Sequence, residues 1–375
     1  MTKNNDKILR VLHVVTIMNL GGIETFLMTL YRNLDYNIIQ FDFLVHREEE
    51  GFFDEEIKKL GGKIFHIRSL NPRFYFEYRK QLKSILQANH YNIIHSHLNA
   101  NSSIILRIAK EMGIKCRIAH GHSDTTTRGL KGMLKLVNKL FINNVSTHRF
   151  ACSDRAGKWL FGENVDFKVI KNAIDTSKFR FNNDKRRSIR IEFGFNDNTI
   201  VIGNVARFNF LKNHAFIMDV FAAVVTKYSD SKLLLLGDGE LLEEVKNKTF
   251  RLGLEDKVIF AGAVGNANEY LNAMDVFLFP SLFEGLGIVA IEAQTNGLPV
   301  VMNYTLPQEL DITPLAHRLS LSAPLEEWAD AIWKVATNKT DRTVWQPNVT
   351  EKGYDVQENV KLLTSFYQKA TIDSN

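Results

Sequence analysis

An apolar run, a glycine-rich turn and a helix-like segment follow one another in the second half of the chain. The apolar run covers residues 276–281, and the turn consists of Glu284, Gly285, Leu286 and Gly287. This order is typical of the carboxyl end of a buried parallel strand, which is where open α/β sheets bind ligands. Glycines let the backbone approach a ligand closely, and the free N–H groups of a new helix attract phosphate. The turn is therefore a candidate phosphate-binding site.

Two carboxylates accompany this turn. Glu284 lies at its mouth, and Glu292 lies in the helix-like segment, with seven residues between the two. Because carboxylates repel phosphate, this pairing is explained if the carboxylates hold hydroxyl groups of the same ligand. A nucleotide sugar carries both kinds of group. We expect its phosphates to meet the amides and its hydroxyls to meet the glutamates.

Cations and glycines stand at two further predicted strand ends. Arg207 and Lys212 follow an apolar run at residues 200–205, while Gly21 and Gly22 follow one at residues 9–17. Arginine grips phosphate bidentately and lysine supplies a point charge, so the two cations could stabilise a departing diphosphate without a metal. The paired glycines offer backbone N–H groups to an anion. Solvated loop cations and a simple tight turn are the alternative interpretations.

Two His-x-His pairs follow apolar runs in the first half of the chain. The pairs are His95 with His97 and His120 with His122. A histidine at a strand end can bond substrate hydroxyls or transfer a proton, and we favour His122 for this role, followed by His120. The spacing would also suit zinc, but no third ligand is apparent nearby, so we predict no metal site.

Short apolar runs alternate with helical patterns along the whole chain. Strands are expected at residues 9–17, 41–45, 63–67, 92–95, 117–120, 150–153 and 168–170, and then at 200–205, 233–236, 258–261, 276–279 and 299–302. Such alternation implies parallel sheets with right-handed crossovers. The expected fold class is α/β, with two Rossmann-like doubly wound domains that face a central cleft.

The expected domains are residues 1–175 and 176–350, followed by a helix in residues 351–375 that crosses back to the first domain. The polar stretch at residues 175–188 is the expected linker. Two cysteines, Cys116 and Cys152, form no CxxC pair, which predicts reduced thiols and a cytoplasmic location. The polar N-terminus is unlike a signal peptide, and no apolar stretch approaches the ~18 residues needed to span a bilayer.

The charge distribution predicts an anionic partner for the first half. Residues 1–175 hold 26 Lys and Arg against 17 Asp and Glu, whereas the rest of the chain holds 21 against 25. A membrane surface or a phosphate-bearing acceptor would fit, while no zinc-finger or RNA-binding motif supports nucleic acid. Lys131, Lys135 and Lys139 recur at helical spacing among apolar residues, which would suit peripheral contact with an anionic membrane. A core helix with a solvated basic face is the alternative.

Taken in order, these segments resemble the family 4 retaining glycosyltransferases of GT-B architecture over nearly the whole chain. Glu284 and Glu292 match the family's E-x7-E signature, in which the first glutamate contacts the transferred sugar and the second contacts the nucleotide ribose. Arg207 and Lys212 match the cation pair that contacts the donor phosphates.

Three further segments carry the resemblance. Gly21 and Gly22 match a loop near the same phosphates, and residues 172–175 (Asn-Ala-Ile-Asp) resemble the family's N-G-I-D before the linker. Glu309 resembles a further acidic position of the donor site. Asn213 and Ala173 depart from the pattern, because the family usually has glycine at both positions.

The resemblance implies the activity of the chain. Residues 1–175 would bind the acceptor, and residues 176–350 would bind a nucleotide sugar, with a UDP-sugar favoured. A hexose would pass with retention to a hydroxyl of a saccharide linked to polyprenyl pyrophosphate, at the inner face of the cell membrane, in exopolysaccharide or capsule biosynthesis. No cofactor or metal would be obligatory.

Three other activities compete with this interpretation. A nucleotide-sugar epimerase of the same architecture would share the donor residues. A nicotinamide-dependent oxidoreductase is suggested by Gly285-x-Gly287-x-x-Ala290, although Glu284 would crowd a pyrophosphate there. A non-catalytic sugar-nucleotide sensor would need the same binding residues.

Overall fold

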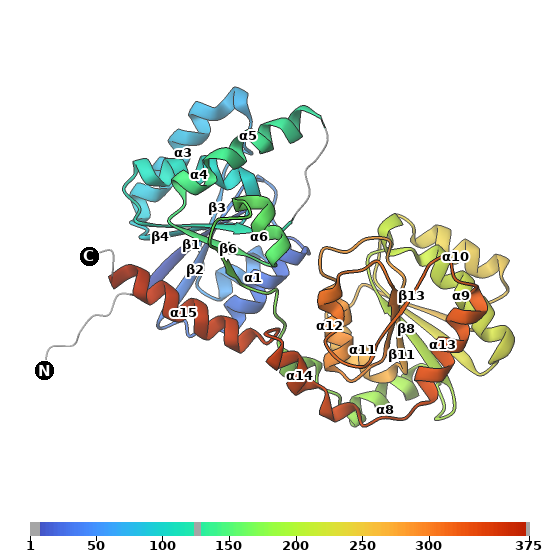
Figure 1. Ribbon diagram of the computed structural model, residues 1–375. Coiled ribbons are helices and arrows are strands. Elements are labelled where there is room, and N and C mark those ends of the chain that lie inside the picture. Colours follow the sequence, from blue (N-terminus) through green and yellow to red (C-terminus); the bar gives the residue numbers. More distant parts are fainter. Residues whose placement is uncertain (1–7, 124–128, 373–375) are drawn as a thin grey trace, which may run out of the picture. The chain divides into compact units, whose positions relative to one another are not determined.

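The computed structural model describes residues 8–123 and 129–372 (Figure 1). The chain forms two compact units, each built on its own sheet. Unit 1 consists of two segments, one that ends at Ile174 and one that begins at Asp355, whereas unit 2 is Asp175–Tyr354. The C-terminal helix therefore belongs to the same unit as the N-terminal half.

Unit 1 contains a seven-stranded parallel sheet with the strand order β3-β2-β1-β4-β5-β6-β7. The strands are β1 (Leu9–Val15), β2 (Ile39–Val45), β3 (Ile64–His66), β4 (Ile93–Ser96), β5 (Cys116–Gly121), β6 (His148–Ala151) and β7 (Lys168–Val169). The direction of strand addition reverses between β1 and β4, and ligands of open α/β sheets bind at the carboxyl ends of strands at such a switch point.

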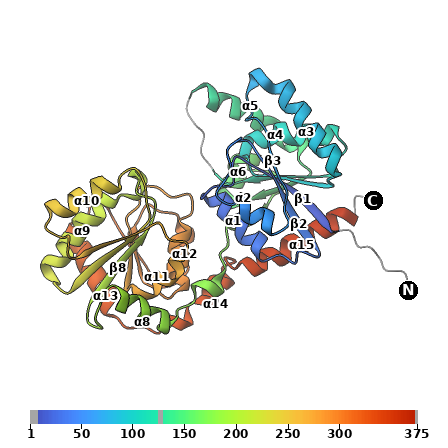
Figure 2. The ribbon, with the colours of Figure 1, turned by 180° about the vertical axis from the view of Figure 1, so that it is seen from behind.

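Helices cover both faces of this sheet (Figures 1 and 2). One core contains α1 (Gly22–Arg32), α2 (Asp54–Lys59) and α15 (Val356–Ile372). The other contains α3 (Tyr75–Asn89), α4 (Ser102–Glu111), α5 (Leu130–Val145) and α6 (Asp154–Phe161). Because both faces are covered, every residue of β2 is buried, as is typical of a parallel sheet.

Unit 2 repeats this plan with six parallel strands in the order β10-β9-β8-β11-β12-β13. The strands are β8 (Ile200–Val205), β9 (Ser231–Leu236), β10 (Val258–Gly262), β11 (Val276–Phe279), β12 (Val300–Asn303) and β13 (Ala316–Leu319). Its switch point lies between β8 and β11.

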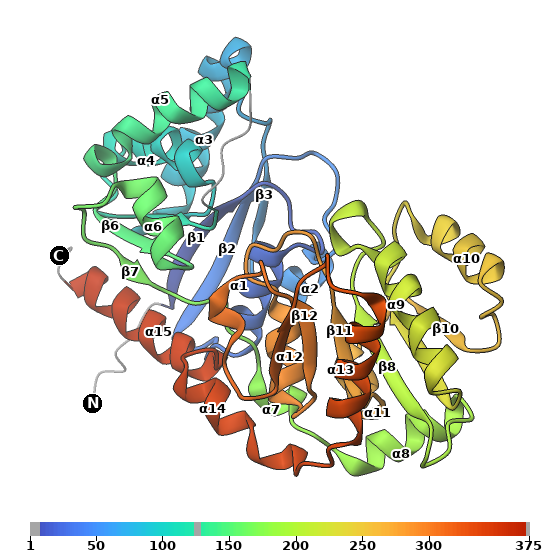
Figure 3. The ribbon, with the colours of Figure 1, turned by 45° about the vertical axis from the view of Figure 1, so that its right-hand side comes forward.

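The helices of unit 2 pack on both faces of its sheet. They are α7 (Thr176–Phe179), α8 (Asn183–Glu192), α9 (His214–Lys227), α10 (Leu242–Arg251), α11 (Ala267–Ala273), α12 (Ile288–Thr295), α13 (Leu325–Thr337) and α14 (Gln346–Glu351). Helices α9 and α13 lie side by side over one face (Figure 3), where the rings of Phe216 and Trp328 meet edge to face at 5.3 Å.

The predicted fold class of two Rossmann-like parallel-sheet domains is confirmed, but the expected linker is wrong. Residues 175–188 do not form an open connection, because α7 and the start of α8 occupy them and belong to unit 2. Asn182 accepts a hydrogen bond from the N–H of Lys185 and caps α8, and Arg186 pairs with Asp275 at 2.6 Å. The polar residues that suggested a linker are thus a helix cap and a solvated helix face. Strand β13 was not among the expected strands.

Candidate functional site

The predicted donor residues of unit 2 come together at the carboxyl edge of its sheet. Lys212 ends a short 3₁₀ turn, η3 (Phe210–Lys212), in the loop after β8. Glu284 lies in the loop after β11, the strand that pairs with β8 at the switch point. The Lys212 ammonium contacts both carboxylate oxygens of Glu284, at 2.7 and 2.8 Å. Two candidate site residues that are 72 positions apart in sequence are therefore direct partners.

This ion pair is largely withdrawn from water. The side chain of Glu284 is 9% exposed and that of Lys212 is 23% exposed. A carboxylate this deeply buried needs a cation or hydrogen-bond donors, because desolvation of a lone charge costs several kcal/mol. Lys212 supplies that cation, and the contact fixes the positions of both charged groups.

The two loops are also joined through their backbones. The N–H of Leu282 donates to the carbonyl of Leu211 at 2.8 Å, and the side chain of Asn213 donates to the carbonyl of Pro280 at 3.2 Å. Asn213 has φ 57°, in the left-handed region that glycine and asparagine adopt most readily. Asparagine can therefore replace the glycine that family 4 glycosyltransferases usually have here. Its backbone tolerates the positive φ, and its side chain adds a hydrogen bond between the loops.

The glycine turn leads into α12 without a side-chain cap. Gly287 is the N-cap residue with φ 86°, and no side chain accepts a hydrogen bond from the first turn. A Cβ at Gly287 would lie 3.0 Å from the ring of Phe279 and 3.2 Å from Leu310, so both conformation and space favour glycine. Gly285 has open space around it, and Leu286 is half-buried. The uncapped N–H groups of α12 are available to an anion.

Glu292 lies in α12, where it is half-buried. Burial raises the pKa of Glu292 to about 7. Among the described residues, no hydrogen bond or ion pair to its carboxylate was found, in contrast to Glu284. A buried carboxyl group with a raised pKa and no protein partner is suited to form a hydrogen bond with a hydroxyl group of a ligand.

Arg207 lies in the same region but in a different setting. Its guanidinium contacts Glu240 at 3.1 Å, and both side chains are mostly exposed, at 71% and 57%. Glu240 follows Gly237 and Gly239 in the loop after β9, and a Cβ at either glycine would collide with the backbone of the Arg207 loop. Sequence reasoning missed this loop, although two glycines and an acidic residue after a predicted strand were a signal for it. Glu309 is exposed in η4 (Gln308–Leu310) after β12.

In unit 1, Gly21 and Gly22 lie at the start of α1, at the end of the loop that follows β1. Gly21 is the N-cap residue, and no side chain caps the helix. The carboxylate of Glu24 fills the space beside Gly21, with one oxygen 2.3 Å from where a Cβ would lie. Burial raises the pKa of Glu24. An anion at this helix end would meet the free amides and would have to share the space with Glu24.

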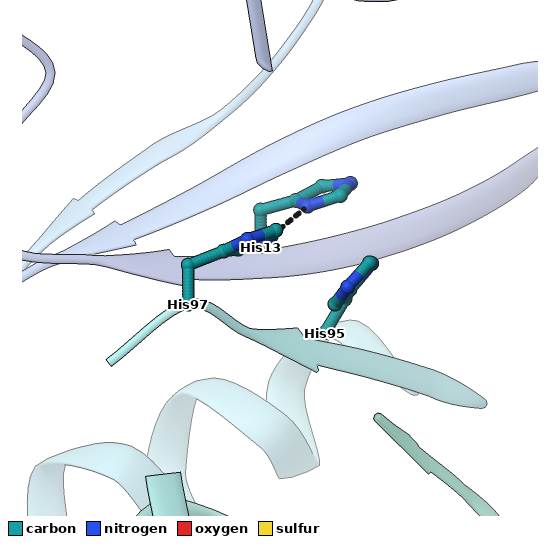
Figure 4. A group of neighbouring side chains, drawn as sticks. All are labelled: His13, His95 and His97. Atoms are coloured by element: carbon teal, nitrogen blue, oxygen red, sulfur yellow. Dashed lines mark hydrogen bonds between the residues drawn. The ribbon is translucent and has the colours of Figure 1, made fainter. Parts of the chain in front are cut away.

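The expectation that the histidine pairs lack a third ligand is wrong. Strand β1 pairs with β4 at the switch point of unit 1, and this register places His13 opposite His95. His13, His95 and His97 thereby form one group with ring nitrogens within 4.8 Å of one another (Figure 4), and His97, His120 and His122 form a second group. Local spacing along the chain carries no information about which strand lies next to β4, so His13 was overlooked.

The five imidazoles are linked in two chains of hydrogen bonds. In the first, His13 Nδ1 contacts His97 Nε2 at 3.0 Å, and His97 Nδ1 contacts His122 Nε2 at 2.8 Å. In the second, Tyr367 of α15 contacts His95 at 2.8 Å, and His95 Nε2 contacts His120 Nδ1 at 3.1 Å. Both favoured candidates, His122 and His120, are thus the ends of chains that reach into the core.

Burial keeps these histidines neutral. It lowers the pKa of His13 and of His122 to about 3, and it lowers the pKa of His95, His97 and His120 well below the ordinary 6.5. His120 is fully buried, whereas His122 is half-buried and its backbone N–H donates to the side chain of Asn99 at 2.8 Å. Of the two, His122 is therefore better placed to meet a substrate.

Two family models match the chain, one on each unit. "Glycosyltransferase Family 4" matches residues 20–178, and "Glycosyl transferases group 1" matches residues 185–352. Together they cover the strand ends that carry Gly21, Lys212 and Glu284.

Curated relatives agree with these matches. The putative glycosyltransferase EpsF of Bacillus subtilis is 33% identical, over 96% of this chain and 97% of its own length. The capsular polysaccharide biosynthesis glycosyltransferase CapH of Staphylococcus aureus is 23% identical, over 97% of this chain and all of its own. A UDP-Gal:α-D-GlcNAc-diphosphoundecaprenol α-1,3-galactosyltransferase of Escherichia coli is 28% identical over 59% of this chain and 60% of its own.

A solved structure shares the fold. HepE of Anabaena, in complex with UDP and glucose, superposes with a TM-score of 0.75 at 18% identity, over 96% of this chain and all of its own. The two parallel-sheet units with their switch points thus match a known two-domain architecture. Given the full-length match to EpsF and the two family models, the chain belongs to the family 4 glycosyltransferases of GT-B fold and is a glycosyltransferase.

Proposed function

We propose that this enzyme transfers a hexose from a UDP-sugar, with retention, to a hydroxyl group of a lipid-linked saccharide in the synthesis of a surface polysaccharide. The observation that carries the donor half of this proposal is the contact between Lys212 and Glu284 beside the uncapped N-terminus of α12. It places a cation, free amides and a carboxylate at one switch point, which are the partners that a diphosphate and a sugar require. HepE, whose solved complex contains UDP and glucose, has the same fold.

Each donor residue has a distinct role in this proposal. Lys212 has three N–H donors, so it can bind a phosphate oxygen while it still holds Glu284. Arg207 is exposed and has only a surface partner, Glu240, and it can turn to the diphosphate at small cost because surface ion pairs contribute little. Glu284 would accept hydrogen bonds from the sugar, and Glu292 from the ribose.

The transfer needs stabilisation of the leaving group above all. The bond from the sugar C1 to the phosphate oxygen breaks, the acceptor oxygen bonds to C1 on the same face, and the acceptor proton passes to the leaving phosphate. Negative charge grows on the diphosphate during this step, and Lys212, Arg207 and the α12 amides would stabilise it as preorganised donors. This scheme involves no obligatory metal ion at the donor phosphates.

The acceptor half of the proposal rests on the surface of α5. Six large apolar side chains are exposed on this helix, namely Met133, Leu134, Leu136, Val137, Leu140 and Phe141. Exposed apolar surface of this extent on one helix is uncommon unless it meets a membrane or another protein. Lys135 and Lys139 are half-buried, and the side chain of Lys131 lies outside the described residues.

This surface would suit an anionic bilayer. The apolar face can enter the headgroup region while the lysines meet lipid phosphates, so the enzyme would stay near a lipid-linked acceptor. No helix in residues 8–123 or 129–372 combines the length and the apolar character that crossing a bilayer demands. The relative from Escherichia coli is named for an acceptor linked to diphosphoundecaprenol, and CapH is named for capsule synthesis, which supports the same acceptor class.

The experiment that tests the proposal is a transfer assay with purified enzyme. UDP-, GDP- and ADP-sugars are first ranked by thermal shift, because a ligand that binds only the folded state raises its stability. The best donor is then incubated with polyprenyl-diphosphate-linked saccharides, with and without EDTA, and the anomeric product is identified by NMR. We expect retention and activity in EDTA. Loss of activity in EDTA that Mn²⁺ restores would overturn the metal-free scheme, and C2- or C4-epimerised donor in the absence of acceptor would indicate an epimerase instead.

A further inference from the structure

The second histidine group in unit 1 has the composition of a transition-metal site. His97, His120 and His122 offer ring nitrogens that all lie within 4.8 Å of one another. Three neutral imidazoles with a free fourth position are a common ligand set of zinc. In a tetrahedral site with Zn–N bonds of about 2.0–2.1 Å, two ligand nitrogens are about 3.4 Å apart. The 2.8 Å contact between His97 and His122 needs to widen only slightly to admit an ion.

Two members of this group have nitrogens without a partner. His120 Nε2 and His122 Nδ1 are buried and make no hydrogen bond within the described part of the chain. A buried polar nitrogen without a partner costs roughly 1–3 kcal/mol. A bound cation would take up the lone pair of His120 Nε2 and would remove this cost.

The neighbouring residues are suited to orient the ligands. Metal-binding histidines usually give their second ring nitrogen to another polar group, which fixes the ring and its tautomer. Here His120 Nδ1 contacts His95, and His95 in turn contacts Tyr367. His97 Nε2 contacts His13. Two of the three ligands therefore have such a partner. His120 keeps Nε2 for an ion, whereas His97 Nδ1 contacts His122, the third ligand.

We propose that His97, His120 and His122 bind a divalent transition-metal ion, with zinc as the favoured ion, through His97 Nδ1, His120 Nε2 and a ring nitrogen of His122. This goes beyond the proposed transfer reaction, in which groups of unit 2 would hold the leaving group. Imidazole ligands favour zinc, copper or nickel over magnesium or calcium, which prefer oxygen.

The position of His122 gives an ion a way in. The group that consists of His13, His95 and His97 is buried throughout, whereas His122 is half-buried at the carboxyl end of β5. An ion that enters beside His122 would keep one coordination position open towards solvent, where water can bind.

The test measures zinc binding directly and needs no substrate. The full chain is produced with a cleavable tag that contains no histidine, and zinc content is measured by mass spectrometry after dialysis against buffer with zinc and then without it. Affinity is measured by competition with a chromophoric chelator, and Co²⁺ substitution reports tetrahedral coordination through its visible spectrum.

Two variants remove a ligand while they keep its neighbour. His97→Gln places an amide where Nε2 was, so it can still bond His13 but lacks the Nδ1 ligand. His120→Asn places an amide where Nδ1 was, so it can still bond His95 but lacks the Nε2 ligand. His90→Asn is the matched control, because His90 is exposed and has φ 51°, which asparagine tolerates. Circular dichroism and thermal melts verify that each variant folds.

We expect one zinc ion per wild-type chain, about 100-fold or greater loss of affinity in both ligand variants, and wild-type binding in His90→Asn. Removal of a mere outer neighbour typically costs 10–100-fold, so loss of a ligand should cost at least the upper part of that range. The proposal would be overturned if His97→Gln and His120→Asn folded and kept the zinc content of the wild type. It would also be overturned if the wild-type chain bound no zinc. Neither result depends on the transfer assay.

Discussion

Replacement of Glu292 by glutamine should stabilise the ligand-free enzyme and weaken its donor binding. Burial raises the pKa of Glu292 from the ordinary 4.5 to about 7. The folded state therefore keeps a proton that the unfolded chain has lost between these two pH values. It follows that the free energy of unfolding falls as the pH rises from about 4.5 to 7, and that the full penalty is present above pH 7.

The size of the effect follows from the same two values. A difference from 4.5 to about 7 corresponds to about 3 kcal/mol, and partial exposure of the side chain reduces this to about 2 kcal/mol. Glutamine removes the charge and keeps the shape. Glu292→Gln should thus raise the free energy of unfolding by about 2 kcal/mol at pH 8 and by little at pH 4.5, with a rise in Tm of roughly 4–8 °C for the transition of unit 2 at pH 8.

Donor binding should change in the opposite direction. If the ionised carboxylate accepts a ribose hydroxyl, its loss costs about 1.5–3 kcal/mol, or roughly 10–150-fold in the Kd for UDP. Wild-type UDP affinity should also rise with pH up to about 7, and this dependence should vanish in the variant.

Thermal melts at pH 4.5 and 8 and calorimetric titration with UDP measure both effects. Glu255→Gln, which changes an exposed loop residue of unit 2, serves as the control. A variant that is no more stable than wild type at pH 8, or equally stabilised at both pH values, would refute the reasoning about burial. Unchanged UDP affinity would refute the role of Glu292 in donor binding.

Three further predictions concern other contacts. Lys212→Met should lower kcat by about 10²–10³-fold. It should also destabilise the fold, because the buried Glu284 carboxylate loses its partner. Addition of Glu284→Gln to this variant should restore stability but not turnover, and equal instability of the single and double variants in urea melts would contradict the pairing. Asn213→Val should cost about 1–3 kcal/mol of unfolding free energy because of its positive φ, whereas Asn213→Gly should cost less; equal losses would show that the backbone angle does not matter. Replacement of the exposed Met133, Val137 and Leu140 by serine should weaken sedimentation with anionic vesicles about tenfold or more, while Phe250→Ser on α10 should not, and unchanged vesicle binding would exclude α5 as the membrane contact.

Much of the fold was predictable because each strand and helix has its own periodic pattern. The predicted run at residues 200–205 is β8, and the run at 276–279 is β11. Parallel strands that are buried on both faces need continuous apolar runs, and such runs are visible in sequence. The glycine turn was also visible, since only glycine combines positive φ with the close packing found at Gly287.

The candidate site was predictable as a set of strand ends but not as a set of contacts. Arg207 and Lys212 were expected to face phosphate, yet in the structure their partners are Glu240 and Glu284. Arg207 and Lys212 follow β8, and their carboxylate partners follow β9 and β11, the two strands that flank β8 in the sheet. The sequence does not state which strands are neighbours.

By itself, the sequence determined the alternation of elements, the apolar strands and the turns at which backbone N–H groups become free, because these follow from local residue types. Only the tertiary structure decided which strand ends meet. The placement of β1 beside β4 joins His13 to His95 and His97, and that of β8 beside β11 joins Lys212 to Glu284. Strand order depends on how distant segments pack together, and no local pattern of residues encodes it.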